Sequence, residues 1–400
     1  MGLGIRSEDS ETTIVIKPPN KWWVVVIGAG LALSPIHNKW LTNLATNDAG
    51  ETLFFLPAVG YLLLIMGATL FLLHNWERVK EVGWGDKKIV VPLLFIIAAI
   101  GLSGVGIDGG VTAKLAPLGM GLFLFAVYLT ARVLGKAMFL PLAVGAGVAS
   151  LGIIAHQICE PGMTTGGFIF ERNFDIATGY ILLGVALLVR NKRQWLLAGL
   201  ALLSLLMSGA PEAVFALGVI GFVVLLRRDW GVKSAVLIPT VIAVIFVFAS
   251  GYGQTLFHYT YQSLAGHATV RPIPEMGTTE GMSPLLWRWH VIKVAMGDIS
   301  SLGDGYNLTN FTVSTVHNVP LIIIQQLGWL GLLAGLAWLW ISVWCLVKTR
   351  WKYAWALVLT LSVFDHFIWT QLAPVWPALI GASTTDVNNK SDLVFRGEKL

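Results

Sequence analysis

The sequence predicts an all-α, polytopic membrane protein with about twelve transmembrane helices and one large outer loop that contains short helices. Hydrophobic residues make up 56% of the 400-residue chain and charged residues only 12%, against about 25% charged residues in a soluble domain. Most apolar residues lie in runs close to the length of about 20 residues that crosses a bilayer core. Basic residues concentrate in alternate segments between these runs, as the positive-inside rule predicts.

Each predicted span is a predominantly apolar run, and several are short. The spans are residues 21–36, 52–74, 88–105, 113–134, 138–156, 175–190, 194–208, 211–227, 233–250, 318–347, 352–368 and 369–383. The last two are equally consistent with one broken hairpin. The first run follows a mixed polar segment without a small-residue cleavage site, which favours an anchor over a signal peptide.

The basic residues orient the chain. With a cytoplasmic N-terminus, 21 of the 27 Lys and Arg residues fall in inside segments, and both termini are predicted to be cytoplasmic. Residues 1–250 then hold the first nine spans, 251–317 form a large periplasmic or outer loop, 318–383 hold the last three spans, and 384–400 form a cytoplasmic tail.

The net charge of +5 is explained by segments that flank the membrane and face anionic headgroups. Membrane lipids are therefore expected partners, and nucleic acid is not. Cys159 and Cys345 are predicted near opposite faces, so they are not expected to pair, and neither has metal-ligand spacing. No zinc, nucleotide-binding or serine-nucleophile pattern occurs, so we expect no metal and no cofactor.

The outer loop at 251–317 is rich in aromatic residues and His, unlike a disordered linker. Ser283 and Pro284 favour a helix start, and we predict a helix over 284–297 at the membrane interface. Two further polar clusters, at 156–175 and 208–212, are predicted on the same side. Their coincidence indicates one outward-facing site.

His317 is the first candidate for chemistry. Asn318 is a good cap for the apolar helix after it, and Pro320 fits the first turn of that helix. A His beside a helix N-terminus is disfavoured as the imidazolium, so it can accept a proton as a general base. The alternative is an interface His that only hydrogen-bonds a neighbour.

Arg288 is the second candidate, because it lies in a loop nearly free of basic residues and a guanidinium binds phosphate through two hydrogen bonds. The helix start after His317 can add backbone donors to the same anion. The alternative is an Arg that reaches to lipid headgroups. Arg172 and Arg271 are the other candidate diphosphate-binding residues, or else solvated loop cations.

Three further residues are candidates for substrate binding: Asn318, His290 and Asp304. Asp304 lies in the turn Gly303-Asp304-Gly305, which we interpret as flexible. A solvated turn carboxylate is the simpler interpretation of Asp304.

At these residues the chain resembles the O-antigen ligase and O-antigen polymerase family of integral-membrane glycosyltransferases, best over about 160–335. The similar elements, in order, are Phe168-Ile169-Phe170-Glu171-Arg172-Asn173, Arg288-Trp289, Gly303-x-Gly305, His317-Asn318 and Gln326-x-Gly328-x-x-Gly331. Two departures stand out: Gln326 replaces the usual acidic residue, and Ser208-Gly209-Ala210-Pro211-Glu212 replaces a Ser-Arg-Gly signature.

The resemblance implies a metal-independent, inverting glycosyl transfer on the periplasmic face of a bacterial inner membrane. The donor would be a glycan on undecaprenyl diphosphate, and the acceptor a sugar hydroxyl of lipid A core in a ligase or of another glycan in a polymerase. His317 would match the family's base, and Arg288 its diphosphate-binding Arg. We favour the ligase. A transporter or flippase for a lipid or polar solute is the alternative from another class, and broken helices with internal repeats would favour it.

Overall fold

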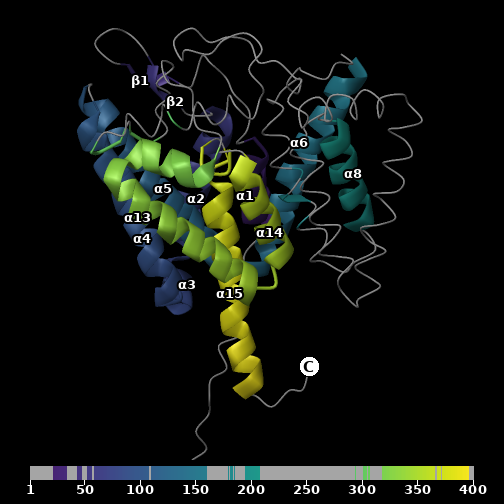
Figure 1. The fold of residues 1–400 in the computed structure, drawn as a ribbon. Coiled ribbons are helices and arrows are strands. Elements are labelled where there is room, and N and C mark those ends of the chain that lie inside the picture. The colour runs from purple at the N-terminus through teal and green to yellow at the C-terminus, as the bar shows by residue number, and fades with distance from the viewer. Residues whose placement is uncertain are drawn as a thin grey trace, which may run out of the picture.

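The computed structural model describes residues 21–33, 43–46, 52–55, 58–107, 110–159, 194–207, 318–364, 367–370 and 372–395, and also 179, 181, 182, 184, 293, 301–303, 305 and 306. Within these ranges the chain is helical apart from one two-stranded hairpin, which confirms the helical class. Its helices pack side by side as a bundle (Figure 1). The elements are α1 (Lys21–Leu33), β1 (Asn43–Thr46), β2 (Thr52–Phe55), α2 (Ala58–His74), α3 (Trp76–Val82), α4 (Lys87–Ser103), η1 (Gly104–Gly106), α5 (Val111–Leu134), η2 (Gly135–Met138), α6 (Phe139–Cys159), α8 (Gln194–Met207), α13 (Val319–Lys348), α14 (Lys352–Phe364) and α15 (Val375–Phe395).

Three stretches of the described chain are long and apolar enough to cross a membrane: Lys87–Gly106, Val111–Ala155 and Val319–Lys348. The second contains α5 and α6, which η2 separates. Shorter apolar helices cover Trp22–Leu31, Gly60–His74 and Lys352–Val363. The chain therefore has the character of a membrane protein, and the number of twelve crossings stays a prediction.

Several predicted boundaries are wrong. The span at 52–74 begins with strand β2, and its helix starts only at Ala58. At the other end of the chain, α14 ends at Phe364 and turns occupy 367–370 and 372–374 before α15 begins at Val375. α15 then continues to Phe395, into the segment predicted as a tail.

Three elements were not predicted: β1, β2 and α3. β1 and β2 pair antiparallel, and the sequence between them, Asn47-Asp48-Ala49-Gly50-Glu51, contains three turn formers. Helix α3 is a short surface helix in which Glu77 pairs with Lys80 at 2.9 Å and Val79 is buried. It ends at Gly83, whose φ of 63° favours glycine.

Helix α15 packs against α5 and α13 and runs through the middle of the view in Figure 1. It approaches α5 closely at Gly381, where a Cβ atom would collide with the backbone oxygen of Tyr128 and come within 2.8 Å of the backbone nitrogen of Arg132. Small residues allow such close backbone contact between membrane helices. Around this pair, α4 and α2 pack on α5, and α13 packs on α4 and α14.

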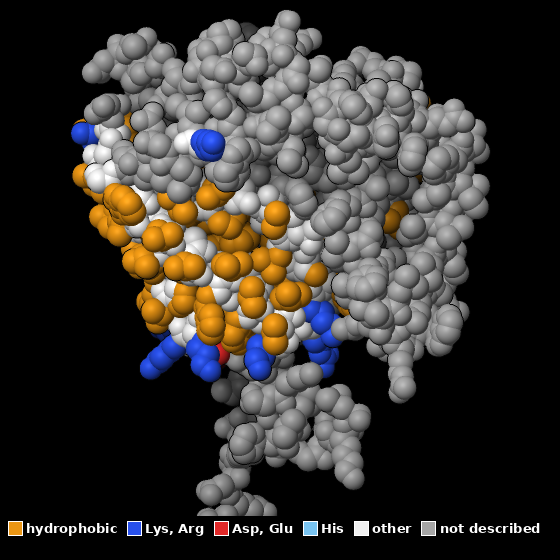
Figure 2. Space-filling model, viewed as in Figure 1, with side chains coloured by type: hydrophobic (Ala, Val, Ile, Leu, Met, Phe, Trp, Pro, Cys, Tyr) orange, Lys and Arg blue, Asp and Glu red, His pale blue; other side chains and the backbone are white. Residues whose placement is uncertain are grey.

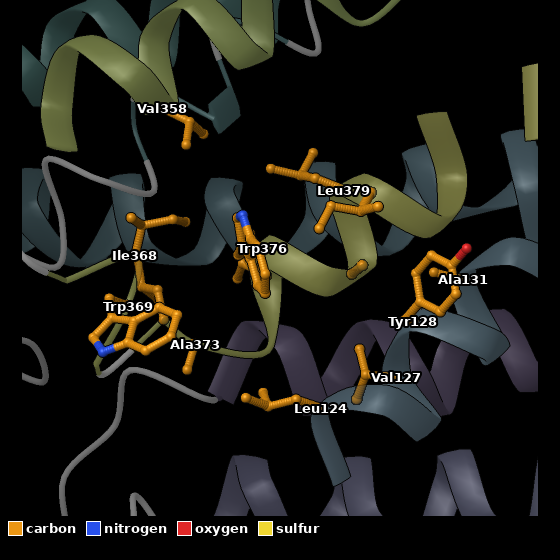
Figure 3. Packing of buried hydrophobic residues seen from close by; sticks show 14 of the residues in the cluster. Leu124, Val127, Tyr128, Ala131, Val358, Ile368, Trp369, Ala373, Trp376 and Leu379 are labelled. Atoms are coloured by element: carbon orange, nitrogen blue, oxygen red, sulfur yellow. The ribbon is translucent and has the colours of Figure 1, made fainter. Parts of the chain in front are cut away.

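The core between these helices is rich in tryptophan. Five of its largest fully buried side chains are Trp338, Trp351, Trp355, Trp369 and Trp376. Figure 3 shows where α5, the turn before α15, and α15 itself contribute to this core. Because lipid tails are as apolar as leucine, packing and hydrogen bonds between helices hold such a bundle together.

One face of the bundle exposes a broad apolar surface, and Lys and Arg side chains gather along its lower margin (Figure 2). α13 alone exposes eight large hydrophobic side chains, a pattern that suits lipid rather than water. They are Trp329, Leu332, Leu333, Leu336, Leu339, Trp340, Val343 and Val347.

Candidate functional site

Of the seven predicted site residues, Asn318 lies within the described part of the chain. The other six lie outside the described residues; they are His317, Arg288, Arg172, Arg271, Asp304 and His290. The structure does describe the residues on either side of Asp304 and the whole helix after His317. These residues form the outer-end cluster, which we define as 301–306, 318–331 and 367–370, without Asp304.

Asn318 caps helix α13, as the sequence predicts. Its side-chain oxygen accepts a hydrogen bond from the backbone N–H of Leu321 at 3.2 Å, and Pro320 occupies the first turn. Its amide nitrogen donates to the backbone oxygen of Val363 in α14 at 3.0 Å. Asn318 therefore fixes the start of α13 to the end of α14.

This helix start offers few backbone donors to an anion. Of its first three residues, Pro320 has no N–H and the N–H of Leu321 is bonded to Asn318. The remaining residue, Val319, is fully buried. Binding of a diphosphate here would therefore depend mainly on arginine side chains, and less on the helix end than we expected from the sequence.

The sequence suggested that α13 is one straight helix. In the structure, the chain reverses its direction at Gly328. This residue has φ 61° and ψ −140°, a conformation that favours glycine. A Cβ atom on Gly335 would lie 3.6 Å from the backbone oxygen of Pro320, whereas fifteen residues of straight helix extend about 22 Å. The short segment 319–327 therefore folds back along the long segment 329–348.

The reversal changes how this part of the chain can cross a membrane. Val319–Lys348 qualifies as one span by length and composition. Only the long segment runs straight, and its 20 residues extend about 30 Å, which matches a bilayer core. Gly331 makes the return possible, since a Cβ atom there would collide with the backbone oxygen of Ile323.

Residues 301–303, 305 and 306 hold the reversal in place, and we call them the strap. The N–H of Gly305 donates to the backbone oxygen of Gln326 at 3.0 Å, and the N–H of Trp329 donates to the oxygen of Ser301 at 3.3 Å. A Cβ atom on Gly303 would collide with Gln326, and φ there is 76°. Close packing therefore requires a glycine at 303, and the φ of 96° at Gly305 favours glycine there as well.

A buried hydrogen-bond network connects the strap to the rest of the bundle. Trp369 donates from Nε1 to Oε1 of Gln326 at 2.9 Å, and the hydroxyl of Tyr306 donates to the Trp369 backbone oxygen at 2.9 Å. The backbone N–H of Tyr306 donates to Oγ of Ser103, at the end of α4, at 3.1 Å. Burial raises the pKa of the Tyr306 hydroxyl, so this group remains a donor at physiological pH.

The outer-end cluster thus brings together two sequence elements that carried the family resemblance, Gly303-x-Gly305 and Gln326-x-Gly328-x-x-Gly331. Sequence reasoning missed Trp369, Tyr306 and Ser103. Their signal was weak, since a Trp or Tyr in an apolar run is typical of a core and a helix-end Ser is common.

The described residues of this cluster are joined mainly by hydrogen bonds between neutral groups. They place a capped helix start beside the end of α14 and supply neutral hydrogen-bonding groups. No group of three or more His, Cys, Asp or Glu side chains capable of holding a metal occurs among the residues that the structure describes. A comparison with protein-family models found no match to the chain, and neither did a comparison with curated proteins.

Proposed function

We propose that this protein is a membrane glycosyltransferase that moves a glycan from undecaprenyl diphosphate to a sugar hydroxyl on the outer face. One observation supports the proposal above the others: the strap packs against the reversal in α13, and Asn318 bonds the start of that helix to the end of α14. His317, the predicted base, is the residue that precedes this cap. A rigid helix start is what a general base needs, since misplacement by about 1 Å can cost a hundredfold in rate.

In the proposed reaction His317 takes the proton of the acceptor hydroxyl. The hydroxyl oxygen then forms a bond to the anomeric carbon of the donor, and the bond from that carbon to the diphosphate oxygen breaks. The electron pair leaves with undecaprenyl diphosphate, so the anomeric configuration inverts. Arg288, with Arg172 and Arg271, would stabilise the negative charge of the leaving diphosphate. A lipid A core acceptor would make the protein a ligase, and a lipid-linked glycan acceptor would make it a polymerase.

The test is glycan transfer by purified protein in the presence of a metal chelator. The donor is an undecaprenyl-diphosphate-linked glycan, offered with lipid A core or with a second lipid-linked glycan. We expect His317→Ala to lose activity by about a hundredfold or more, since a general base typically contributes about a hundredfold to ten-thousandfold. Arg288→Ala should also lose most activity.

Two matched variants control for folding and for loop chemistry. His258→Ala removes another His of the same loop, and Lys293→Ala removes a cation from the helix predicted to hold Arg288. Both should keep near-normal transfer. Normal turnover by a well-folded His317→Ala protein would refute its assignment as the base.

One observation favours the transporter alternative, because α13 is broken and discontinuous helices form the substrate sites of many transporters. Those breaks lie near the middle of the membrane. Here the break precedes a segment already long enough to span, and the freed oxygen of Gln326 is bonded to Gly305. Movement of lipid or solute across proteoliposomes, without glycan transfer, would establish the transporter instead.

A further inference from the structure

The short segment 319–327 of α13 is anchored at both ends to the same part of the chain. At its start, Asn318 donates to the backbone oxygen of Val363. Near its end, Gln326 accepts the indole N–H of Trp369. Both partners belong to the end of α14 and the turn after it, so two points fix the position and the direction of the segment.

Gln326 makes this second anchor with two hydrogen bonds, one accepted by its side chain and one by its backbone oxygen. Its side chain is bonded to Trp369 at 2.9 Å, and its backbone oxygen is bonded to Gly305 at 3.0 Å. The residue is 5% exposed, and Trp369 is 2% exposed. A buried amide oxygen that loses its donor has no water to replace it, so either the bond forms or the segment must shift.

A second tryptophan in the same core shows what this bond adds. Trp376 is also 2% exposed, and its ring meets that of Trp369 edge to face at 6.2 Å. Its indole nitrogen, however, has no hydrogen-bond partner among the described residues. The two tryptophans therefore share burial and aromatic packing, but their side chains differ in the hydrogen bond of the indole N–H.

We propose that Gln326 and Trp369 are positioning residues. Their hydrogen bond holds the short segment 319–327 of α13, so that its capped start keeps its position beside the end of α14. The effect on turnover rests on the proposed function, which places the chemistry beside that start. The placement of the segment itself does not depend on it.

The experiment compares variants that keep or remove the bond. Trp369→Phe keeps an aromatic ring and removes the donor, and Gln326→Met keeps the length and removes the acceptor. Gln326→Glu keeps an acceptor oxygen and is the rescue variant. Trp376→Phe is the matched control, because it removes an indole N–H that has no partner in the described structure.

Two readouts are measured on the folded fraction of each full-length protein. The first is hydrogen–deuterium exchange at the backbone amides of residues 321–327. The second is kcat and KM for glycan transfer. We expect Trp369→Phe and Gln326→Met each to speed exchange about tenfold and to lower kcat about tenfold, with KM changed less than about twofold. Gln326→Glu and Trp376→Phe should stay within about twofold of the wild type in both readouts. The double variant should be no worse than either single variant, since both remove the same bond.

Unchanged exchange and unchanged kcat in both Trp369→Phe and Gln326→Met would overturn the proposal. An equal loss in Trp376→Phe would overturn it as well, because the effect would then come from aromatic packing. If the wild type transfers no glycan, the proposed function fails, and the exchange measurement alone decides the positioning role. If Gln326→Met does not fold, the comparison of Trp369→Phe with Trp376→Phe decides the positioning role by itself.

Discussion

The two ends of the bundle are held together by different chemistry. At the predicted outer end, neutral groups connect the elements, as in the bonds of Gln326 to Trp369 and to Gly305. At the predicted inner end, a buried cation adds to such neutral bonds, one of which is donated by the Tyr128 hydroxyl to the Trp84 backbone oxygen at 2.8 Å. Arg132 of α5 donates to the backbone oxygens of Gly83 and Val82 at 3.1 and 3.4 Å and to Oγ1 of Thr384 in α15 at 3.1 Å.

Arg132 is 1% exposed, and no carboxylate pairs with it among the described residues. Its charge is stabilised instead by carbonyl groups at the end of α3, where the helix dipole is negative. Hydrogen bonds from a charged donor are about twice as strong as neutral ones. The comparison indicates a firmly locked inner end and an outer end whose neutral bonds, about 1 kcal/mol each, open at lower cost.

The largest effect is expected at the outer end from Gly303→Ala. The new methyl group would collide with Gln326 and with the nitrogen of Gly328, at a φ that disfavours alanine. We expect a loss of about 4 kcal/mol, from overpacking and backbone strain together. The midpoint of thermal unfolding in detergent would measure it.

The control for that variant is Gly119→Ala in α5, where nothing lies within 4 Å of the added carbon. It should be neutral or slightly stabilising, by up to about 1 kcal/mol. Equal midpoints for the two variants would contradict the close packing at Gly303.

The hydrogen bonds of Arg132 at the predicted inner end are tested by Arg132→Met, which keeps an apolar stem and removes every donor. The backbone oxygens of Val82 and Gly83 would lose the Arg132 donor in a partly buried site, and the hydroxyl of Thr384 would lose the bond that it accepts from Arg132. We expect a loss of about 3 kcal/mol by the same unfolding measurement. The loop at 82–85 should also become more accessible to proteolysis. A midpoint equal to that of the wild type would show that the charge is dispensable and remove the contrast between the ends.

The smallest effect is expected from Asn318→Ala. This change removes the helix cap and the bond to Val363, but the rest of the outer-end cluster stays in place. Loss of a cap costs about 1 kcal/mol. Hydrogen exchange should increase at residues 321–323 and remain unchanged at 329–348, where the long segment begins its own helix. Asn318→Asp retains an acceptor oxygen for the cap and should restore most of the protection.

Features that depend on local composition could be predicted from the sequence. Long apolar runs between charged residues located α4 and α5 to within about two residues, and Asn318 with Pro320 located the start of α13. The strands β1 and β2 were missed because four residues of each are too few for a clear alternation. The end of α15 was missed because its last turns are polar.

The cluster at the outer end could not be predicted because its contacts join distant residues. Gln326 and Trp369 are 43 positions apart, and Tyr306 and Ser103 are 203 apart. Gly328 lies in a continuous apolar run, where a glycine is usually tolerated within a straight helix. The fold shows why a glycine is needed at 328, since the short segment before it lies close to Gly331 and Gly335 of the long segment. The predicted roles of His317 and Arg288 stay predictions.

The reversal in α13 also has a consequence for biosynthesis. The ribosome makes residues 301–306 before the reversal, so the strap is present when the short segment enters the membrane region. Trp369 is made 43 residues after Gln326. Until it emerges, the Gln326 amide lacks its donor in an apolar environment, where an unsatisfied polar group costs several kcal/mol. This bond can therefore form only after Trp369, in the turn that follows α14, has been translated, which makes it one of the last contacts of assembly.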